Sequence, residues 1–299
     1  MKPLFFALPG NDDLARRLCA ELDGESGELT VRRFPDGESY VRYGCDVHGR
    51  SIVLVCTLDR PDDKVIALYL AASIARELGA ASVGLVAPYL AYMRQDARFK
   101  PGEGISSAHF ARLVSGFADW MVTVDPHLHR HAHLSEIYRI PTTVVHAAPA
   151  ISHWIRNEVR DPIVIGPDSE SEQWAAEVAH GAGCPFMILQ KERHGDREVE
   201  LSMPDSNPLT QRTPVLVDDI ASTARTMVAA VANLNRLRAR QPACVVVHPI
   251  FAEDAYQALT EAGADRIASC NTIAHASNRI DIAHLLAAGV AGFLRPRSD

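Results

Sequence analysis

The chain has 299 residues, of which 47% are hydrophobic and 22% are charged, and its formal net charge is −7. This composition is typical of a well-packed globular protein of one or two domains, and it excludes the disordered and fibrous classes. The acidic balance offers no basic surface to a nucleic-acid backbone, and no apolar run reaches the ~18 residues of a membrane-spanning helix. We therefore expect neither nucleic acid nor a membrane as a partner.

Two further features favour a cytoplasmic protein. The start MKPLFFALPG carries one Lys before a short apolar run, which is more typical of a first strand than of a signal peptide. The 6 cysteines lie far apart without a Cys-x-x-Cys pair. We therefore expect reduced, mostly buried thiols rather than a zinc site or a disulfide framework.

Short β-rich runs alternate with helical patterns along nearly the whole chain. Strands are predicted at residues 4–8, 29–33, 51–56, 82–86, 120–124, 142–146, 162–166, 186–190, 213–217 and 244–248. Helices are predicted between them, for example at residues 62–78, 106–116, 171–181 and 223–238. Continuous apolar runs such as SIVLV and PVLV are typical of parallel sheets with helices on both faces, so the pattern predicts an α/β fold.

A weak internal repeat relates the two halves of the chain. VLVCTLDRPDDKV, a helix and VGLVAPYLAY parallel VLVDDIASTARTM, a helix and VVVHPIFAED at nearly the same spacing. Two copies of one βαβ unit explain this agreement, and the alternative is chance similarity between parallel-sheet units. We predict two tandem domains, at residues 1–146 and 147–299.

The segment PVLVDDIASTARTM has the pattern of a phosphate site. Asp218 and Asp219 follow an apolar strand, and a turn of small hydroxyl residues leads into a helix. Backbone N–H groups of such a turn and helix bind phosphate, while the carboxylates can contact sugar hydroxyls or metal-bound water. The alternative is that Asp219 and Ser222 cap the helix without any ligand.

This segment resembles the phosphoribosyl diphosphate loop of type I phosphoribosyltransferases and of ribose-phosphate diphosphokinases. Phosphoribosyltransferases would share this loop alone, whereas further motifs resemble the diphosphokinases in the same order along most of the chain. These motifs are FPDGESYVR (34–42), APYLAYMRQD (87–96), VDPHLH (124–129), IGPDSESEQWAAEVA (165–179), QKERHGDREV (190–199) and CNTIAH (270–275). The resemblance implies two tandem phosphoribosyltransferase-type, Rossmann-like domains with parallel sheets.

The resemblance also implies a reaction. The β,γ-diphosphate of ATP would move to the 1-hydroxyl of ribose 5-phosphate, giving phosphoribosyl diphosphate and AMP, with Mg²⁺ as cofactor. Lys191 and Arg193 would be the catalytic cations of a closing lid, and their alternative is a solvated charged hairpin. His127 and Asp168 would bind the metal. Because Mg²⁺ prefers carboxylates and water, we expect the imidazole to act partly through water.

Substrate contacts follow from the same motifs. ATP would be bound by Phe34, Asp36, Glu38, Arg94 and Gln95. Ribose 5-phosphate would be bound by Asp218, Asp219, Ser222, Thr223, Ala224, Arg225 and Thr226. The Pro-Asp-Gly turn alone predicts a hairpin at residues 34–38. The resemblance adds that this hairpin reaches over from a neighbouring subunit, so we expect a homo-oligomer built from dimers, with a hexamer as one candidate size.

Some positions depart from the family pattern. Ser169, Glu170 and Ser171 replace the usual Ala-Gly-Gly, Ser222 stands where many members have Asp, and Arg225 stands where Gly is usual. Residues 128–137 do not resemble the regulatory phosphate site. The histidines of LHRHAHL (His129, His131 and His133) would fit zinc, but a polar surface is favoured because they lack partners at zinc-site spacing. Two alternatives stay open: a non-catalytic regulatory relative, and a phosphoribosyltransferase-type enzyme acting on another sugar phosphate.

Overall fold

The computed structural model of the chain describes residues 1–128, 130–167, 171–194, 198–202, 209, 211–237 and 239–294. The chain forms two compact units. Unit 1 contains Met1–His146 and the segment that begins at Ala283, and unit 2 contains Ala147–Ile282. The last helix, Ala283–Leu294, belongs to unit 1, whereas the predicted boundary places it in the second domain, residues 147–299.

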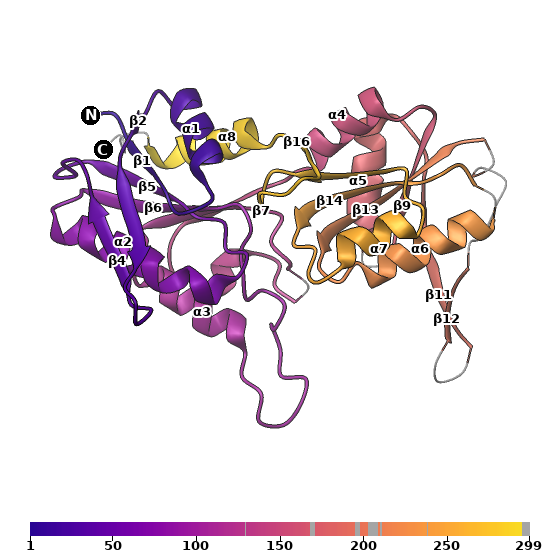
Figure 1. Cartoon of the computed structure of the whole chain (residues 1–299), viewed down its shortest axis with the longest axis horizontal. Coiled ribbons are helices and arrows are strands. Elements are labelled where there is room, and N and C mark those ends of the chain that lie inside the picture. The colour runs from indigo at the N-terminus through magenta and orange to yellow at the C-terminus, as the bar shows by residue number, and fades with distance from the viewer. Residues whose placement is uncertain are drawn as a thin grey trace. The chain divides into compact units, whose positions relative to one another are not determined.

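Unit 1 is a three-layer α/β structure (Figure 1). Its six-stranded sheet has the order β2-β1-β5-β6-β7-β8, and every pairing in it is parallel. The strands are β1 (Leu4–Ala7), β2 (Glu25–Ser26), β5 (Ser51–Val55), β6 (Ser82–Ala87), β7 (Trp120–Val124) and β8 (Thr142–Val145). Helices α1 (Asp12–Glu21) and α8 (Ala283–Leu294) lie on one face, and α2 (Val65–Glu77) and α3 (Ser106–Ser115) on the other. Short 3-10 turns occur at Pro61–Asp63 and Leu134–Glu136.

Unit 2 has the same three layers. Its sheet has the order β10-β9-β13-β14-β15-β16 and is also parallel throughout. The strands are β9 (Pro162–Gly166), β10 (Phe186–Ile188), β13 (Thr213–Ala221), β14 (Ala243–Pro249), β15 (Arg266–Cys270) and β16 (Asn278–Ile280). Helices α4 (Ala148–Glu158) and α5 (Glu172–Ala182) lie on one face, and α6 (Arg225–Arg236) and α7 (Ala255–Glu261) on the other. Leu216 and Val246 of the sheet belong to the buried core under α6 and α7.

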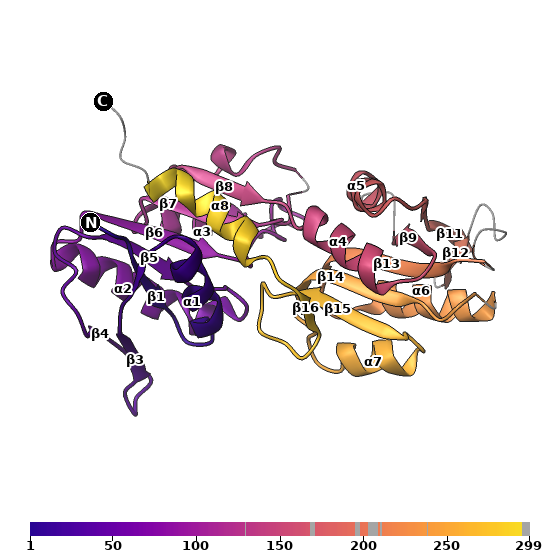
Figure 2. The same cartoon turned by 90° about the horizontal axis from the view of Figure 1, so that it is seen from above.

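The two units repeat one topology. In each sheet the second strand in sequence lies at one edge, and the first strand lies next to it. The third and later strands of the sheet then follow in chain order toward the other edge. Each unit also carries an antiparallel hairpin at the same point of its topology: β3 (Leu29–Arg33) with β4 (Ser39–Tyr43), and β11 (Gln190–His194) with β12 (Glu198–Ser202). Figure 2 shows the first hairpin projecting from the body of unit 1. The strands β5 and β13, which begin the repeated sequence segments, are topological equivalents.

Every predicted strand and each of the four predicted helices is present, so the parallel α/β fold is confirmed. β13 is longer than predicted because β14 supplies pairing partners as far as Ala221, opposite Pro249. β10 is shorter because its partner β9 ends at Gly166, opposite Ile188. Burial of the thiols is partial: Cys56, Cys244 and Cys270 are buried, whereas Cys45 is exposed. Within the described ranges, no helix combines the length and apolar character needed to cross a membrane.

Candidate active site

The two consecutive carboxylates of unit 2 lie inside the last part of β13 rather than after it. Asp218 pairs with Val246 of β14, and its carboxylate oxygen Oδ1 accepts a hydrogen bond from the Asp219 N–H at 2.9 Å. Both residues are half-buried at the carboxyl end of the strand. Ligands of open parallel sheets bind at this end, so the two carboxylates are available to a substrate.

The turn between β13 and α6 places an alanine at the N-cap position of the helix. Ala224, the N-cap residue, is in the left-handed region at φ +53° and makes no side-chain capping bond. The carbonyls of Ala221 and Ser222 accept the N–H groups of Phe251 and Ala252 at 2.8 and 3.0 Å, so the turn is held against the segment before α7. These bonds do not involve the side chains of Asp219 and Ser222, whose capping of α6 stays an alternative. The first N–H groups of α6 are suited to an anion.

The side chains at this turn and at the start of α6 differ in their solvent exposure. Thr223 and Arg225 are exposed, and Thr226 is half-buried. Arg225 lines a cavity of about 270 Å³ together with Val228 and Ala232 of α6 and the segment Ala252–Asp254 before α7. Its guanidinium forms no ion pair with any residue of the described ranges. The structure thus brings the predicted sugar-phosphate residues together at one strand-to-helix junction.

The predicted hairpin of unit 1 is present, and residues 34–38 at its tip are exposed. The Phe34 N–H donates to the Glu38 carbonyl at 2.8 Å, and Asp36 accepts the Glu38 N–H at 3.2 Å. Gly37 takes φ +95°, which explains the glycine at this position. Phe34 is 39% exposed. The hairpin therefore presents an aromatic ring and two carboxylates on an open surface.

One residue of this hairpin escaped the sequence analysis. The guanidinium carbon of Arg32 lies 4.6 Å from the centre of the Phe34 ring and 4.2 Å from that of Tyr40. A cation at this distance over an aromatic face is attracted by the ring. The Arg-x-Phe spacing is the sequence signal that could have predicted this contact, because residues two apart on a strand lie on the same face.

The loop after β6 carries the predicted nucleotide contacts. Arg94 is exposed, and Gln95 is half-buried. The Ser106 hydroxyl donates to the Gln95 side-chain oxygen at 2.5 Å, and the Ser107 N–H donates to the Gln95 carbonyl at 3.3 Å. These two bonds fix Gln95 to the first turn of α3. The carboxamide nitrogen of Gln95 is the part of the side chain suited to a base or ribose.

The loop after β7 carries His127, which is half-buried. Just before it, Asp125 has φ +30°, an uncommon conformation for a residue with a side chain. The Asp125 carboxylate lies 2.9 Å from Nδ1 of His146 at the end of β8. Because β6 and β7 are neighbours, the loops that hold Gln95 and His127 leave the same edge of the sheet.

The remaining histidines do not form a zinc site in the described part of the chain. Nδ1 of His131 lies 3.0 Å from Glu136, which also accepts the backbone N–H groups of Ala132 and His133. These bonds hold the pKa of the Glu136 carboxyl below its usual value, with the His131 hydrogen bond as the main cause. No group of three or more metal-ligating side chains occurs among the described residues. His129 lies outside them.

The predicted lid and second metal turn are described only in part. The backbone of Lys191 and Arg193 belongs to β11, where the two residues pair with Leu201 and Val199 of β12. The charged QKERHGDREV segment thus begins as an antiparallel hairpin. Asp168, Ser169 and Glu170 lie outside the described residues, and Ser171 stands just before α5.

Comparisons with known proteins agree with this arrangement. The family model of the N-terminal domain of ribose phosphate pyrophosphokinase matches residues 4–117, and that of the phosphoribosyl transferase domain matches residues 133–283. A crystal structure of phosphoribosylpyrophosphate synthetase from Mycobacterium smegmatis shares the fold, with a TM-score of 0.84 and 24% identity. That alignment covers 98% of this chain and 99% of the other.

Two relatives extend the likeness to sequence. The ribose-phosphate pyrophosphokinase of Methanopyrus kandleri is 35% identical over 93% of this chain and 94% of its own length. That of Methanothermobacter thermautotrophicus is 34% identical over 92% of this chain and 95% of its own length. Since both family domains and nearly full-length relatives match in the same order, the chain belongs to the ribose-phosphate pyrophosphokinase family.

Proposed function

We propose that the chain transfers the β,γ-diphosphate of ATP to the 1-hydroxyl of ribose 5-phosphate, giving phosphoribosyl diphosphate and AMP. The observation that carries this proposal is the junction of β13 and α6. Two carboxylates lie there beside the start of a helix, within a chain that matches a ribose-phosphate pyrophosphokinase over 93% of its length. Family membership supplies the reaction, and the junction supplies a chemically suitable place for the sugar phosphate.

The sugar phosphate would bind through complementary parts of this junction. Its 5-phosphate accepts hydrogen bonds from the N–H groups of the turn and from the hydroxyls of Thr223 and Thr226. The ribose hydroxyls donate to Asp218 and Asp219, whose carboxylates can only accept while ionised. Ser222 and Ala224 contribute their backbone to the turn. The 1-hydroxyl, which is the nucleophile, is then held by contacts to the rest of the sugar.

ATP would be held by two segments of unit 1. The exposed ring of Phe34 suits stacking on adenine, and Asp36 and Glu38 can accept hydrogen bonds from the base. Arg94 suits the triphosphate, because its planar guanidinium makes paired bonds to phosphate oxygens. Gln95, fixed to α3 through Ser106, suits the ribose or the base.

Catalysis would rest on charge stabilisation. In phosphoryl transfer the protein has little covalent chemistry to supply, so fixed cations on the phosphate oxygens matter most. We assign this role to Lys191 and Arg193 at the start of the β11–β12 hairpin. Their backbone lies in a two-stranded ribbon separate from the main sheet of unit 2, as suits a segment that closes over substrate.

Mg²⁺ suits a site in which the protein and the substrate phosphates each supply part of its ligands. Mg²⁺ is usually held by one or two carboxylates, water and substrate phosphates rather than by a protein cage. Asp168 and His127 would hold the ion, and the imidazole would act partly through water because Mg²⁺ prefers carboxylate and water ligands. When bound, the ion neutralises charge on the transferred phosphate oxygens.

We further propose a homo-oligomer. Phe34 is exposed at a hairpin tip that unit 1 leaves uncovered, although the residue is assigned to a base-binding site. A neighbouring subunit that receives the hairpin would complete that site.

The test is an assay of the purified protein with ATP, Mg²⁺ and ribose 5-phosphate that quantifies AMP. Formation of AMP that depends on ribose 5-phosphate is the expected result. AMP formation with another sugar phosphate alone would favour the phosphoribosyltransferase-type alternative. No AMP with any sugar phosphate, together with activation of an active relative on mixing, would favour the non-catalytic relative.

A further inference from the structure

A buried carboxylate and an arginine connect two loops of unit 1. The Asp96 side chain is only 4% exposed, and its Oδ1 accepts a hydrogen bond from Nη1 of Arg130 at 2.7 Å. The two residues are 34 positions apart in sequence. A buried carboxylate without a partner is strongly unfavourable, so Asp96 requires this contact.

The same guanidinium holds a second point of the loop. Its central carbon lies 5.3 Å from the centre of the Phe99 ring. The Phe99 side chain is 57% exposed. The Arg130 guanidinium is the cation that contacts its ring. Arg130 thus contacts both Asp96 and Phe99, which are the two ends of a short segment directly after Arg94 and Gln95.

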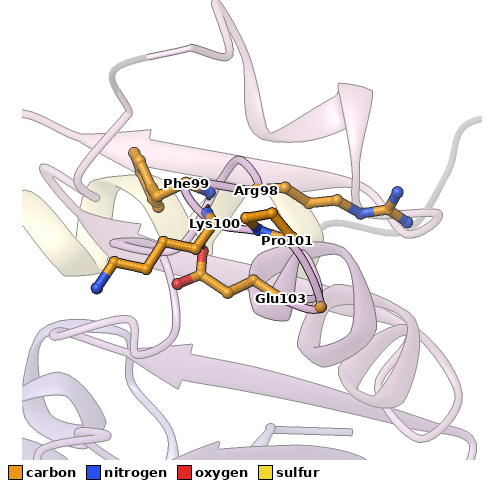
Figure 3. A pocket seen from close by; sticks show the side chains of 6 residues that line it. Arg98, Phe99, Lys100, Pro101 and Glu103 are labelled. Carbon is orange, nitrogen blue, oxygen red and sulfur yellow. Dashed lines mark hydrogen bonds between the residues drawn. The ribbon is translucent and has the colours of Figure 1, made fainter.

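The rest of this loop is closed by its own backbone. The Glu103 carboxylate accepts the N–H groups of Phe99 and Lys100 at 2.8 and 3.0 Å. Residues of this loop line a hollow of about 550 Å³. In Figure 3 the side chains of Arg98 and Lys100 extend from the loop in opposite directions. The Ser106 and Ser107 bonds join the Gln95 end of the loop to α3, and Arg130 joins the Asp96 and Phe99 part of it to the loop after β7.

The ion pair joins the loop that carries the proposed nucleotide contacts to the loop that carries His127. Asp96 follows Gln95 on the loop after β6, and Arg130 lies three positions beyond His127 on the loop after β7. β6 and β7 are paired up to Ala87 and Thr123, so both loops leave the same sheet edge. The ion pair therefore spans the gap between the segment assigned to ATP and the turn assigned to the metal.

We propose that Arg130 is a positioning residue for the nucleotide segment. Through Asp96 and Phe99 it fixes the distance of Arg94 and Gln95 from the loop that carries His127. This inference rests on the proposed function of these segments. Arg130 would act through Asp96 and Phe99, which belong to the nucleotide segment, so its loss should weaken nucleotide binding and leave sugar-phosphate binding unchanged.

A second ion pair of unit 1 provides a matched control. Nη2 of Arg76 lies 2.8 Å from the carboxylate of Asp119, which stands just before β7 and also accepts the Val83 N–H at 2.7 Å. This pair joins an arginine of α2 to an aspartate at the amino end of β7, opposite to the end that carries His127. Loss of an arginine there should affect stability alone.

The experiment compares wild type with Arg130→Met, Arg130→Lys, Asp96→Asn and Arg76→Met. Steady-state kinetics give KM for ATP, KM for ribose 5-phosphate and kcat. Titration calorimetry with an ATP analogue that has a methylene group between the α- and β-phosphorus gives the nucleotide Kd without turnover. Thermal unfolding checks the fold of each variant.

For Arg130→Met we expect KM for ATP and the analogue Kd to rise about tenfold, a typical scale for one charged contact. KM for ribose 5-phosphate should stay within about twofold. Arg130→Lys, which keeps the charge, should recover part of the loss, and Arg76→Met should bind nucleotide like wild type. Should Arg130→Met fail to fold, Arg130→Lys decides by the same two constants.

A folded Arg130→Met variant with wild-type KM for ATP and wild-type analogue Kd would overturn the inference. Equal losses for both substrates, or an equal effect in Arg76→Met, would also overturn it by showing a merely structural role. Wild type that forms no AMP would instead refute the proposed function. The analogue titration would still report on Arg130 in that case.

Discussion

Nδ1 of His248 lies 3.0 Å from the hydroxyl of Thr272, and both side chains are almost completely buried. The Thr272 hydroxyl donates its own proton to the Val247 carbonyl at 2.7 Å. The hydroxyl therefore accepts from His248, which places a proton on Nδ1. His248 pairs in register with Ile220, two residues beyond Asp218, so this chain of bonds ties the loop after β15 to the strand next to the carboxylates.

Thr272→Val should destabilise the protein. The substitution leaves the His248 N–H buried without its acceptor, and an unsatisfied buried donor costs about 1–3 kcal/mol. Urea denaturation should show a lower midpoint with an unchanged slope. Thr272→Ser, which keeps the hydroxyl, is the control and should lose much less. Equal stability of the Val variant and wild type would contradict the bonding inferred for His248.

The sheet architecture could be predicted from the sequence because parallel strands covered on both faces are apolar throughout. SIVLV became β5 and PVLV became the buried part of β13, and their equivalence in two identical topologies confirms the repeat. Strand ends were less predictable, because pairing partners set them. Asp218 and Asp219 look like loop residues in sequence, but β14 extends beside them.

Contacts between distant loops could not be predicted. Nothing near Asp96 in sequence indicates that its carboxylate is buried, and nothing near Arg130 indicates its partner. Such pairs arise only once β6 and β7 lie side by side. The course of the turn before α6 could not be predicted for a related reason, since the segment at Phe251 and Ala252 holds it through bonds to Ala221 and Ser222.

Lys191→Ala and Arg193→Ala should each lower kcat by about 100-fold or more, the scale for removing one preorganised charge contact. Their KM for ribose 5-phosphate should stay nearly unchanged, because cations of a closing lid act mainly in the transition state. Initial rates of AMP formation at varied substrate concentration measure both constants. Arg160→Ala, which removes a 91% exposed arginine of the same unit, is the control. Near wild-type turnover of both lid variants would refute their catalytic role.

Activity should fall on dilution if Phe34 completes the base site of another subunit. Light scattering at the assay concentrations should show an oligomer that dissociates as activity is lost. Phe34→Ala should raise KM for ATP about tenfold or more, since base–aromatic stacking is worth about 1–3 kcal/mol. Leu78→Ala, which removes another exposed apolar side chain of unit 1, should not raise it. A fully active monomer would exclude both the oligomer and this role of Phe34.

Arg225 is the sharpest departure from the family's phosphate loop, where Gly is usual. In the structure Arg225 is exposed and lines the cavity shared with the segment before α7, while Ala224 and not Arg225 takes the left-handed conformation. The backbone at Arg225 is helical, so glycine's conformational freedom is not needed there. The bulk of Arg225 should therefore leave the first N–H groups of α6 accessible to phosphate.

Arg225→Gly should consequently shift KM for ribose 5-phosphate by less than about tenfold, or about 1.4 kcal/mol. Asp219→Asn should lower kcat/KM far more, by about 100-fold, because it removes a carboxylate from the sugar side of the site. Steady-state kinetics on both variants measure the contrast. A larger effect of Arg225→Gly than of Asp219→Asn would show that the guanidinium binds the sugar phosphate. If wild type formed no AMP while the double variant Ser222→Asp/Arg225→Gly did, the loop would be disabled in this chain, and the non-catalytic alternative would hold.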